Sequence, residues 1–342
     1  MNSMCPTQHW LDAITPWLFQ HRQVTYLNVG ANKGFNVCSM MQRMELADNF
    51  TNRDWRAEMD VYMRAQGMRR CRSKAETECG KSGEGLCGVC GACKEKVLTV
   101  VRPKDAPFRQ LNVHAVELIR ENTDWLRWAF HRFGVRGTIM HAGASNVSGS
   151  TLVRAAKFGD EGVFVGTASK VVNSSDSEAQ LVEQNVGGYT PVRLLTIDQY
   201  AREEGIRHVH LASIDAEGQD ALILEGMQSL LDAARVDVFE FEYHWIGFWK
   251  PGQRSLEATL AWLQRRREPF RCYWQGSNGC LAPASPPCWF AAFEIRKMSN
   301  VVCVREGAGA PHQEFVRLAD ACSRPMTHTV LTARPHARTP AR

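Results

Sequence analysis

Residues 24–37 read VTYLNVGANKGFNV, and the predicted fold is built outward from this stretch. Its first part is β-branched and aromatic and ends at Gly30, which predicts a buried strand that closes on a tight turn. Apolar residues at helical spacing follow. The stretch therefore predicts a strand, a glycine turn and a helix, and helix N-terminal amides favour acceptor or anionic ligand groups. A plain tight turn is the alternative, because a glycine loop alone is weak evidence of a ligand.

Strands and helices alternate along most of the chain. Further strands are predicted at 111–118, 137–145, 208–215, 236–244, 270–274 and 300–306, with shorter extended pieces at 161–173, 190–198 and 289–295. Helices are predicted at 120–134, 198–205, 217–234 and 255–267. This alternation predicts an α/β fold with a mostly parallel sheet covered on both faces. The last strands lack a strong intervening helix, which predicts an antiparallel closing strand.

Composition excludes several classes of protein. Of the 342 residues, 44% are hydrophobic and 23% charged, which is typical of a globular protein rather than a disordered or fibrous one. No apolar run approaches the roughly 18 residues of a membrane span. The N-terminus lacks the basic start and apolar centre of a secretory signal, so we expect a cytoplasmic location.

The net charge of +5 lies mostly in residues 323–342, which contain four arginines and no acid. We expect this segment to be a basic disordered tail, because it has little to bury. The rest of the chain is nearly neutral. Nucleic acid is therefore not an expected partner.

Five of the twelve cysteines lie between residues 71 and 93. In a reducing cytosol, clustered thiols indicate a metal before they indicate disulfides. Structural zinc takes four ligands, often from Cys-x2-Cys pairs, so a Zn²⁺ site is predicted on Cys79, Cys87, Cys90 and Cys93. An iron–sulfur cluster and a metal-free thiol-rich loop are the alternatives. Cys272, Cys280 and Cys288 have no close partner pair, and we expect them to be ordinary residues.

Four segments follow from these patterns: an N-terminal segment with the first strand, loop and helix (1–47), a Cys-rich insertion (48–108), the remainder of the α/β domain (109–322) and the tail (323–342). Glu117 ends the second predicted strand, where a carboxylate can accept both hydroxyls of a ribose. If the insertion 48–108 is set aside, the number of residues between the glycine turn and Glu117 approaches that of an ordinary strand–helix–strand unit. An NAD fingerprint is disfavoured, because it needs a glycine where Asn32 stands.

Several stretches together resemble the FkbM-type S-adenosylmethionine-dependent methyltransferases. They are YLNVGANKGFNV, AVELIRENTDWL, LLTIDQY, LASIDAEGQDALILEGM, VFEFEYH and NVVCVRE, in the family's order. The resemblance covers about 24–47 and 111–306. It implies a class I methyltransferase (Rossmann-like) sheet, with the cofactor over the carboxyl ends of the strands.

The same resemblance implies a cofactor site. Carried over residue by residue, the cofactor-binding positions are Asn28, Gly30, Asn32, Gly34, Glu117, Asn122, Ala144 and Ser145. The glycine turn would line the methionine part of S-adenosylmethionine, Glu117 would hold the ribose, and the loop after the third strand would contact adenine.

Candidate catalytic residues lie at the ends of two later strands. Methyl transfer to a hydroxyl requires that the protein align the acceptor and remove its proton. Asp215 or His244 is the predicted base, with Glu217 in a positioning role. The alternatives are that Asp215 and Glu217 cap the following helix and that His244 is a surface histidine.

Two functions follow from the sequence. The first, which the resemblance implies, is an O-methyltransferase that uses S-adenosylmethionine and acts on a hydroxyl of a sugar or small metabolite. The second is a non-catalytic binding or scaffold protein that keeps the fold and docks a partner through the Cys-rich segment. Asn28 and Ser213, which replace the family's usual Asp and Lys, favour the second function slightly.

Overall fold

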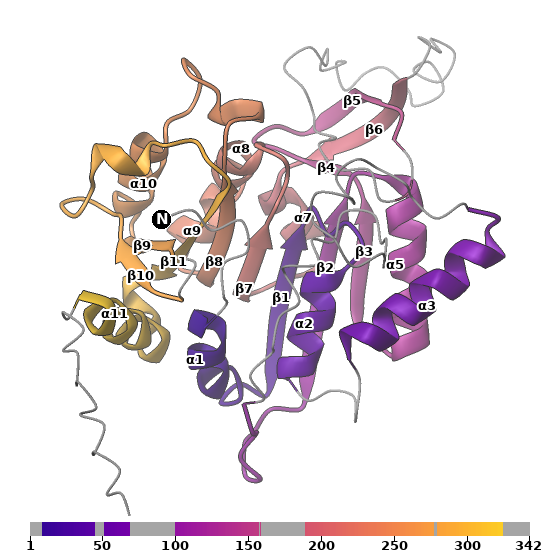
Figure 1. Ribbon diagram of the computed structural model, residues 1–342, viewed down its shortest axis with the longest axis horizontal. Helices are drawn as coiled ribbons and strands as arrows, with labels where there is room; N and C mark the ends of the chain where they lie inside the picture. The colour runs from indigo at the N-terminus through magenta and orange to yellow at the C-terminus, as the bar shows by residue number, and fades with distance from the viewer. Residues whose placement is uncertain are drawn as a thin grey trace, which may run out of the picture.

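The computed structural model describes residues 9–44, 51–68, 100–156, 158, 189–276 and 279–323. An eight-stranded sheet in the order β10-β9-β11-β8-β7-β1-β2-β3 forms its centre (Figure 1). Its parallel part consists of β1 (Gln23–Val29), β2 (Gln110–Glu117), β3 (Gly137–His141), β7 (Val209–Ile214) and β8 (Val236–Tyr243). Its antiparallel part adds β9 (Phe270–Gln275), β10 (Leu281–Pro283) and β11 (Ser299–Arg305). The predicted α/β fold with a mostly parallel sheet and antiparallel closing strands is confirmed.

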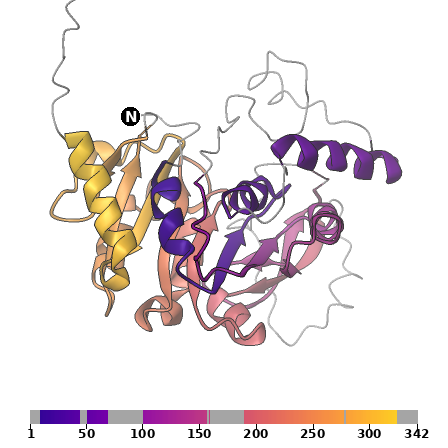
Figure 2. The ribbon, with the colours of Figure 1, turned by 90° about the horizontal axis from the view of Figure 1, so that it is seen from below.

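Helices cover both faces of the sheet, as Figure 2 shows. One face packs against α1 (His9–Leu18), α2 (Phe35–Arg43), α3 (Asn52–Ala65), α5 (Arg120–Phe133) and α11 (Ala310–Ser323). The other face packs against α7 (Ile197–Glu203), α8 (Asp220–Glu225), α9 (Gln228–Asp232) and α10 (Leu256–Gln264). Successive strand residues point to opposite faces, so Tyr26 enters the first core and Leu27 the second.

A second, three-stranded sheet lies beside the carboxyl end of β2. It consists of β4 (Gly143–Ala144), β6 (Tyr189–Leu195) and β5 (Gly149–Arg154), in that order. The predicted strand 137–145 is therefore two strands of different sheets. The predicted extended piece 161–173 lies outside the described residues.

Two helices differ from their predicted form because of contacts distant in sequence. The predicted helix 217–234 is divided into α8 and α9 near Gly226, which lies so close to Ser145 that an added Cβ would be 2.1 Å from the Ser145 carbonyl oxygen. Asp198 does not cap α7, whose N-cap is Thr196. Its carboxylate instead accepts from the Ser229 and Leu230 amides, at 2.7 and 3.0 Å, and so caps α9.

The ends of the described chain also differ from expectation. Helices α1 and α11 were not predicted, and the extended piece expected at 289–295 contains a 3-10 turn at Ala291–Phe293. The helix α3 falls within the predicted insertion 48–108 and opens with a capping box between Thr51 and Asp54. The predicted tail lies outside the described residues beyond Ser323.

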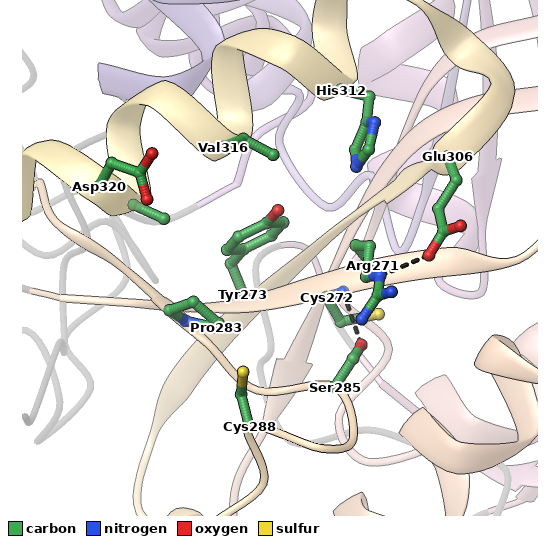
Figure 3. Close-up of a pocket in the computed structure, with 11 residues that line it drawn as sticks. Arg271, Cys272, Tyr273, Pro283, Ser285, Cys288, Glu306, His312, Val316 and Asp320 are labelled. Atoms are coloured by element: carbon green, nitrogen blue, oxygen red, sulfur yellow. Dashed lines mark hydrogen bonds and ion pairs between the residues drawn. The ribbon is translucent and has the colours of Figure 1, made fainter. Parts of the chain in front are cut away.

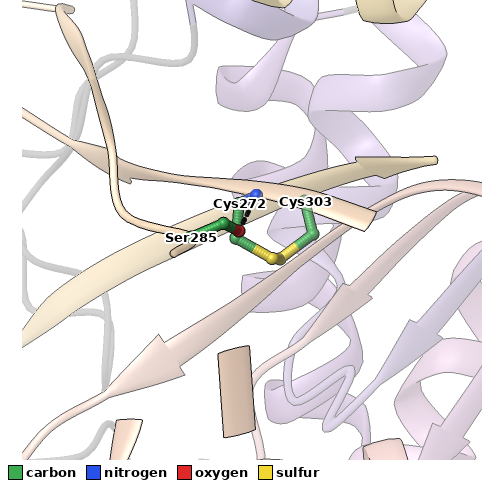
Figure 4. The surroundings of a disulfide bond; sticks show 3 residues. All are labelled: Cys272, Ser285 and Cys303. Atoms are coloured by element: carbon green, nitrogen blue, oxygen red, sulfur yellow. Dashed lines mark hydrogen bonds between the residues drawn. A yellow bond between two sulfur atoms is a disulfide. The ribbon is translucent and has the colours of Figure 1, made fainter. Parts of the chain in front are cut away.

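Two disulfides hold the antiparallel end of the molecule. Cys272 of β9 is bonded to Cys303, its direct neighbour on β11 (Figure 4). Cys280, before β10, is bonded to Cys322 of α11, whereas Cys288 is free and exposed. The expectation that Cys272 and Cys280 are ordinary residues is therefore wrong. Disulfides are typical of oxidising compartments, which counts against the expected cytoplasmic location.

Within the described residues, no helix combines the length and the apolar character that a membrane span requires.

Candidate functional site

The carboxyl ends of the parallel strands bring the predicted site residues to one edge of the sheet. Val29 of β1 pairs with Val116 of β2 and with Ile214 of β7. The next residues along, Gly30, Glu117 and Asp215, therefore lie at the same level. This edge of a parallel α/β sheet is where such folds bind ligands.

Glu117 is the centre of a hydrogen-bonded cluster at this edge. Its Oε2 accepts from the Asn32 amide at 2.6 Å, and its Oε1 accepts from the Ile119 amide at 2.8 Å and the Asn122 side chain at 3.3 Å. Asn122 also donates to Asn32 Oδ1 at 3.4 Å. The carboxylate thus ties the glycine turn after β1 to the end of β2 and to α5. Burial raises the pKa of Glu117, and the amide hydrogen bonds limit that rise.

The glycine turn is shaped by packing as well as by any ligand. Gly30 has φ +76°, and an added Cβ would lie 1.8 Å from the Asp215 carbonyl oxygen. Gly34 has φ +77°, and its Cβ would lie 2.7 Å from the Trp55 ring. Asn32 has φ +45°, a left-handed conformation that asparagine tolerates better than most residues. The two glycines are therefore required by neighbouring groups of this chain.

Asn28 is completely buried beside the turn, and neither its amide nitrogen nor its amide oxygen has a hydrogen-bond partner within the described residues. It lies between Ala115 and Ser213 in the sheet register. Buried polar groups in proteins are almost always satisfied, by protein, water or ligand. This orphaned amide fits a site in which a polar part of a ligand supplies the partner.

Ala144 lies in β4 of the small sheet rather than on the main one, and Ser145 follows it directly. Ala144 pairs with Leu195, and the Ser145 amide donates to the Leu195 carbonyl at 2.9 Å. The Ala142 amide donates to the Glu117 carbonyl at 3.0 Å and joins this loop to the end of β2. The loop is therefore adjacent to the Glu117 cluster, although Ala144 and Ser145 are themselves buried.

The acids after β7 do not cap the following helix. Helix α8 begins at Asp220, and its N-cap, Gln219, makes no side-chain cap hydrogen bond. Asp215 is exposed and Glu217 is partly exposed, with a left-handed φ of +54° at Glu217. Neither acid is therefore the N-cap residue of this helix.

His244 is buried, with 1% of its surface exposed, so it is not a surface histidine. Its Nδ1 accepts from the Ile246 amide at 3.2 Å, and its Nε2 lies 3.3 Å from Glu242 Oε2. Burial lowers the pKa of His244. Because Nδ1 accepts, a neutral imidazole carries its hydrogen on Nε2, and this nitrogen has no hydrogen-bond partner within the described residues.

Asp220 joins the two acidic strand ends and was missed by sequence reasoning. It is fully buried, and its two carboxylate oxygens accept from the Gly218 amide at 3.1 Å and the Glu242 amide at 3.2 Å. Burial first, and the charge of Asp215 second, raise the pKa of Asp220 to about 7. An acid just inside a helix start is common for stability alone, so its position in sequence gave little signal.

A separate cavity of about 350 Å³ lies under α11 (Figure 3). Arg271 and Tyr273 of β9 face His312 and Asp320 of α11 across it, and Arg271 is ion-paired to Glu306. None of the predicted site residues lines it. The cavity is therefore distinct from the ligand edge of the sheet.

The predicted zinc site is overturned. Nowhere in the described ranges do three or more His, Cys, Asp or Glu side chains form a group able to hold a metal ion. Four of the cysteines there are paired in the two disulfides, and a disulfide offers no thiolate to a metal. The proposed ligands themselves lie outside the described residues: Cys79, Cys87, Cys90 and Cys93.

The sheet and its ligand edge define an α/β protein whose binding groups follow the parallel strands. Residues 90–270 match the methyltransferase FkbM domain, which is more than half of the chain, so the chain belongs to the FkbM methyltransferase family. No curated protein matches it. The match begins after the glycine turn at 30–34. That turn follows β1, which pairs with β2 in the same sheet as the matched strands. The resemblance drawn from the sequence motifs is thus confirmed, and methyl transfer is the activity that the family indicates.

Proposed function

We propose that the chain is an S-adenosylmethionine-dependent O-methyltransferase that acts on a hydroxyl of a sugar or small metabolite. The observation that carries the proposal is the Asn32–Glu117–Asn122 cluster beside the glycine turn. The strand order β3-β2-β1-β7-β8 corresponds to the 3-2-1-4-5 order of doubly wound nucleotide-binding sheets. It supports a class I methyltransferase arrangement with the cofactor over the strand ends.

The residues at this edge fit the cofactor chemically. The turn 30–34 and the unpartnered side-chain amide of Asn28 would exchange hydrogen bonds with the amino-acid part of the cofactor. Glu117 uses three of its roughly four lone-pair positions, for the Asn32 and Ile119 amides and the Asn122 side chain, so one lone pair remains for a ribose hydroxyl. When bound, the cofactor supplies the methyl group and the leaving group.

On the acceptor side, we assign the base to Asp215 rather than to His244. Asp215 is exposed at the end of β7, within reach of an incoming hydroxyl. It would take the hydroxyl proton as the acceptor oxygen bonds to the methyl carbon. The His244 Nδ1 lone pair is already used by the Ile246 amide, so a neutral His244 has no free lone pair with which to take a proton. Glu217, on the same turn, would orient the acceptor.

Two measurements test the proposal. Calorimetry with S-adenosylhomocysteine should show binding, and Glu117→Gln should weaken it because the ribose loses a charged acceptor. Transfer of a radiolabelled methyl group to a panel of glycans and small alcohols should then identify acceptors. Asp215→Asn should reduce that transfer by at least about 100-fold with binding unchanged.

The control is Asp232→Asn at the end of α9, just before β8 begins and therefore at the opposite edge of the sheet. If Asp215→Asn transfers the methyl group as fast as this control, Asp215 is not the base. Binding of S-adenosylhomocysteine without transfer to any acceptor would favour the scaffold function, and no binding would reject the proposal.

A further inference from the structure

Two buried tryptophans donate hydrogen bonds to one carbonyl of the glycine turn. Trp55 Nε1 lies 2.8 Å from the Lys33 carbonyl oxygen, and Trp125 Nε1 lies 2.9 Å from the same atom. Both side chains are fully buried. They come from different helices, α3 and α5, which pack against each other beside the turn (Figure 1).

The shared carbonyl lies at the most constrained point of the turn. Lys33 is flanked by Asn32 and Gly34, which have φ values of +45° and +77°. Because the peptide is planar, the direction of the Lys33 carbonyl fixes the direction of the Gly34 N–H, which donates to the Ala31 carbonyl at 2.8 Å. The two indoles therefore set the peptide plane that closes the turn.

The same side chains fill the space behind the turn. The Trp55 and Trp125 rings meet edge to face at 5.7 Å, and Trp55 stacks on Phe133 at 5.3 Å. Gly34 lies directly against the Trp55 ring and Leu126. Thus the turn is held by the indoles on one side, and on the other by the bond from the Asn32 amide to Glu117.

We propose that Trp55 and Trp125 are positioning residues that hold the turn in its cofactor-binding form and so set the affinity for the cofactor. The inference rests on the proposed cofactor site. A ligand that binds only one form of a loop is weakened in proportion to the fraction of protein in that form. Helix α3 lies within the segment predicted as an insertion. Through Trp55, this helix would help to hold the turn of the proposed cofactor site.

The test removes each indole N–H and measures the binding of S-adenosylhomocysteine by calorimetry. Trp55→Phe and Trp125→Phe should each weaken binding about 5-fold, as expected for one neutral hydrogen bond. Each single variant keeps the other indole donor. The affinity of the double variant should therefore fall by more than the product of the two single effects, at least about 50-fold.

Trp10→Phe is the matched control. Trp10 is 1% exposed, and its Nε1 has no hydrogen-bond partner in the part of the chain that the structure describes. This variant loses a similar ring volume and should lower the melting temperature, yet leave binding within about 2-fold of wild type. A general packing defect would lower the affinity of all three single variants by a similar factor.

Replacement of Trp55 by benzothienylalanine, which keeps the ring shape and lacks the N–H, covers the case in which Trp55→Phe does not fold. Affinity equal to wild type for this isostere overturns the inference, as does a loss equal to that of Trp10→Phe. Failure of the wild-type chain to bind S-adenosylhomocysteine is a different result, because it rejects the proposed function and the inference with it. Faster amide exchange at Gly34 in the isostere supports the inference.

Discussion

The two ends of the sheet are held together by different means. The parallel end, around the glycine turn, depends on close backbone approaches such as that of Gly30 to Asp215 and on the hydrogen bonds of Glu117. The antiparallel end depends on covalent links from β9 to β11 and from the segment before β10 to α11. The parallel end is thus held by packing and hydrogen bonds, and the antiparallel end by covalent links.

Gly30→Ala should damage the parallel end most. The new Cβ would have to lie 1.8 Å from the Asp215 carbonyl oxygen, so β1 and β7 must separate at their carboxyl ends. We expect a loss of more than about 4 kcal/mol in the free energy of unfolding, measured by urea denaturation. Gly252→Ala is the control, because Gly252 has φ +82° and no atom within 4 Å of its added Cβ. It should cost only about 1–2 kcal/mol, and equal losses for the two variants would contradict the steric argument.

Removal of the β9–β11 disulfide should weaken the antiparallel end alone. Cys272 and Cys303 are 31 residues apart, so the double variant Cys272→Ala/Cys303→Ala should lose about 3–4 kcal/mol through the entropy of the unfolded chain. Affinity for S-adenosylhomocysteine should stay unchanged. Cys288→Ala, at the free and exposed cysteine, should change neither quantity. A large loss of affinity in the double variant would show that the two ends are coupled.

Asp220 should make the stability of the parallel end depend on pH between pH 3.8 and about 7. Its pKa rises from 3.8 to about 7 on folding, so between these values the unfolded chain has released a proton that the native protein keeps. The unfolding free energy should therefore fall as pH rises, by at most about 1.4 kcal/mol per pH unit, and Asp220→Asn should abolish this component. Melting curves at pH 5, 6, 7 and 8 measure it, with Asp232→Asn as the control. Parallel slopes for wild type and Asp220→Asn would contradict the assignment.

The sequence predicted the order of elements at the parallel end well, because a strand, a turn and a helix each follow a local pattern. A strand, a glycine turn and a helix follow one another at 24–43, and Glu117 was placed at the end of the next strand of the sheet. The structure brings Gly30, Glu117 and Asp215 to one level through strand register alone. Such register follows from the order of parallel strands once the alternation of elements is known.

The remaining features depend on contacts that no local pattern contains. The partners of Cys272 and Cys280 are 31 and 42 residues away, so the spacing of neighbouring cysteines could not indicate them. The break between α8 and α9 comes from the approach of Gly226 to the Ser145 backbone. Asp220 is distinguished only by its burial between two strand ends. The Trp55 contact was hidden for the same reason, since it joins α3 to a turn 22 residues earlier.

The contact of Gly218 with Gly247 bears on how this protein could be re-engineered. A Cβ added to Gly218 would lie 2.4 Å from the Ile246 carbonyl oxygen, one added to Gly247 would lie 2.6 Å from the Gly218 carbonyl oxygen, and the Phe248 amide donates to the latter oxygen at 2.8 Å. A library aimed at new acceptors should therefore keep both glycines and vary Trp245, whose surface is 55% exposed beside them. The side chain at position 245 would then change while the contact between the two turns stayed the same.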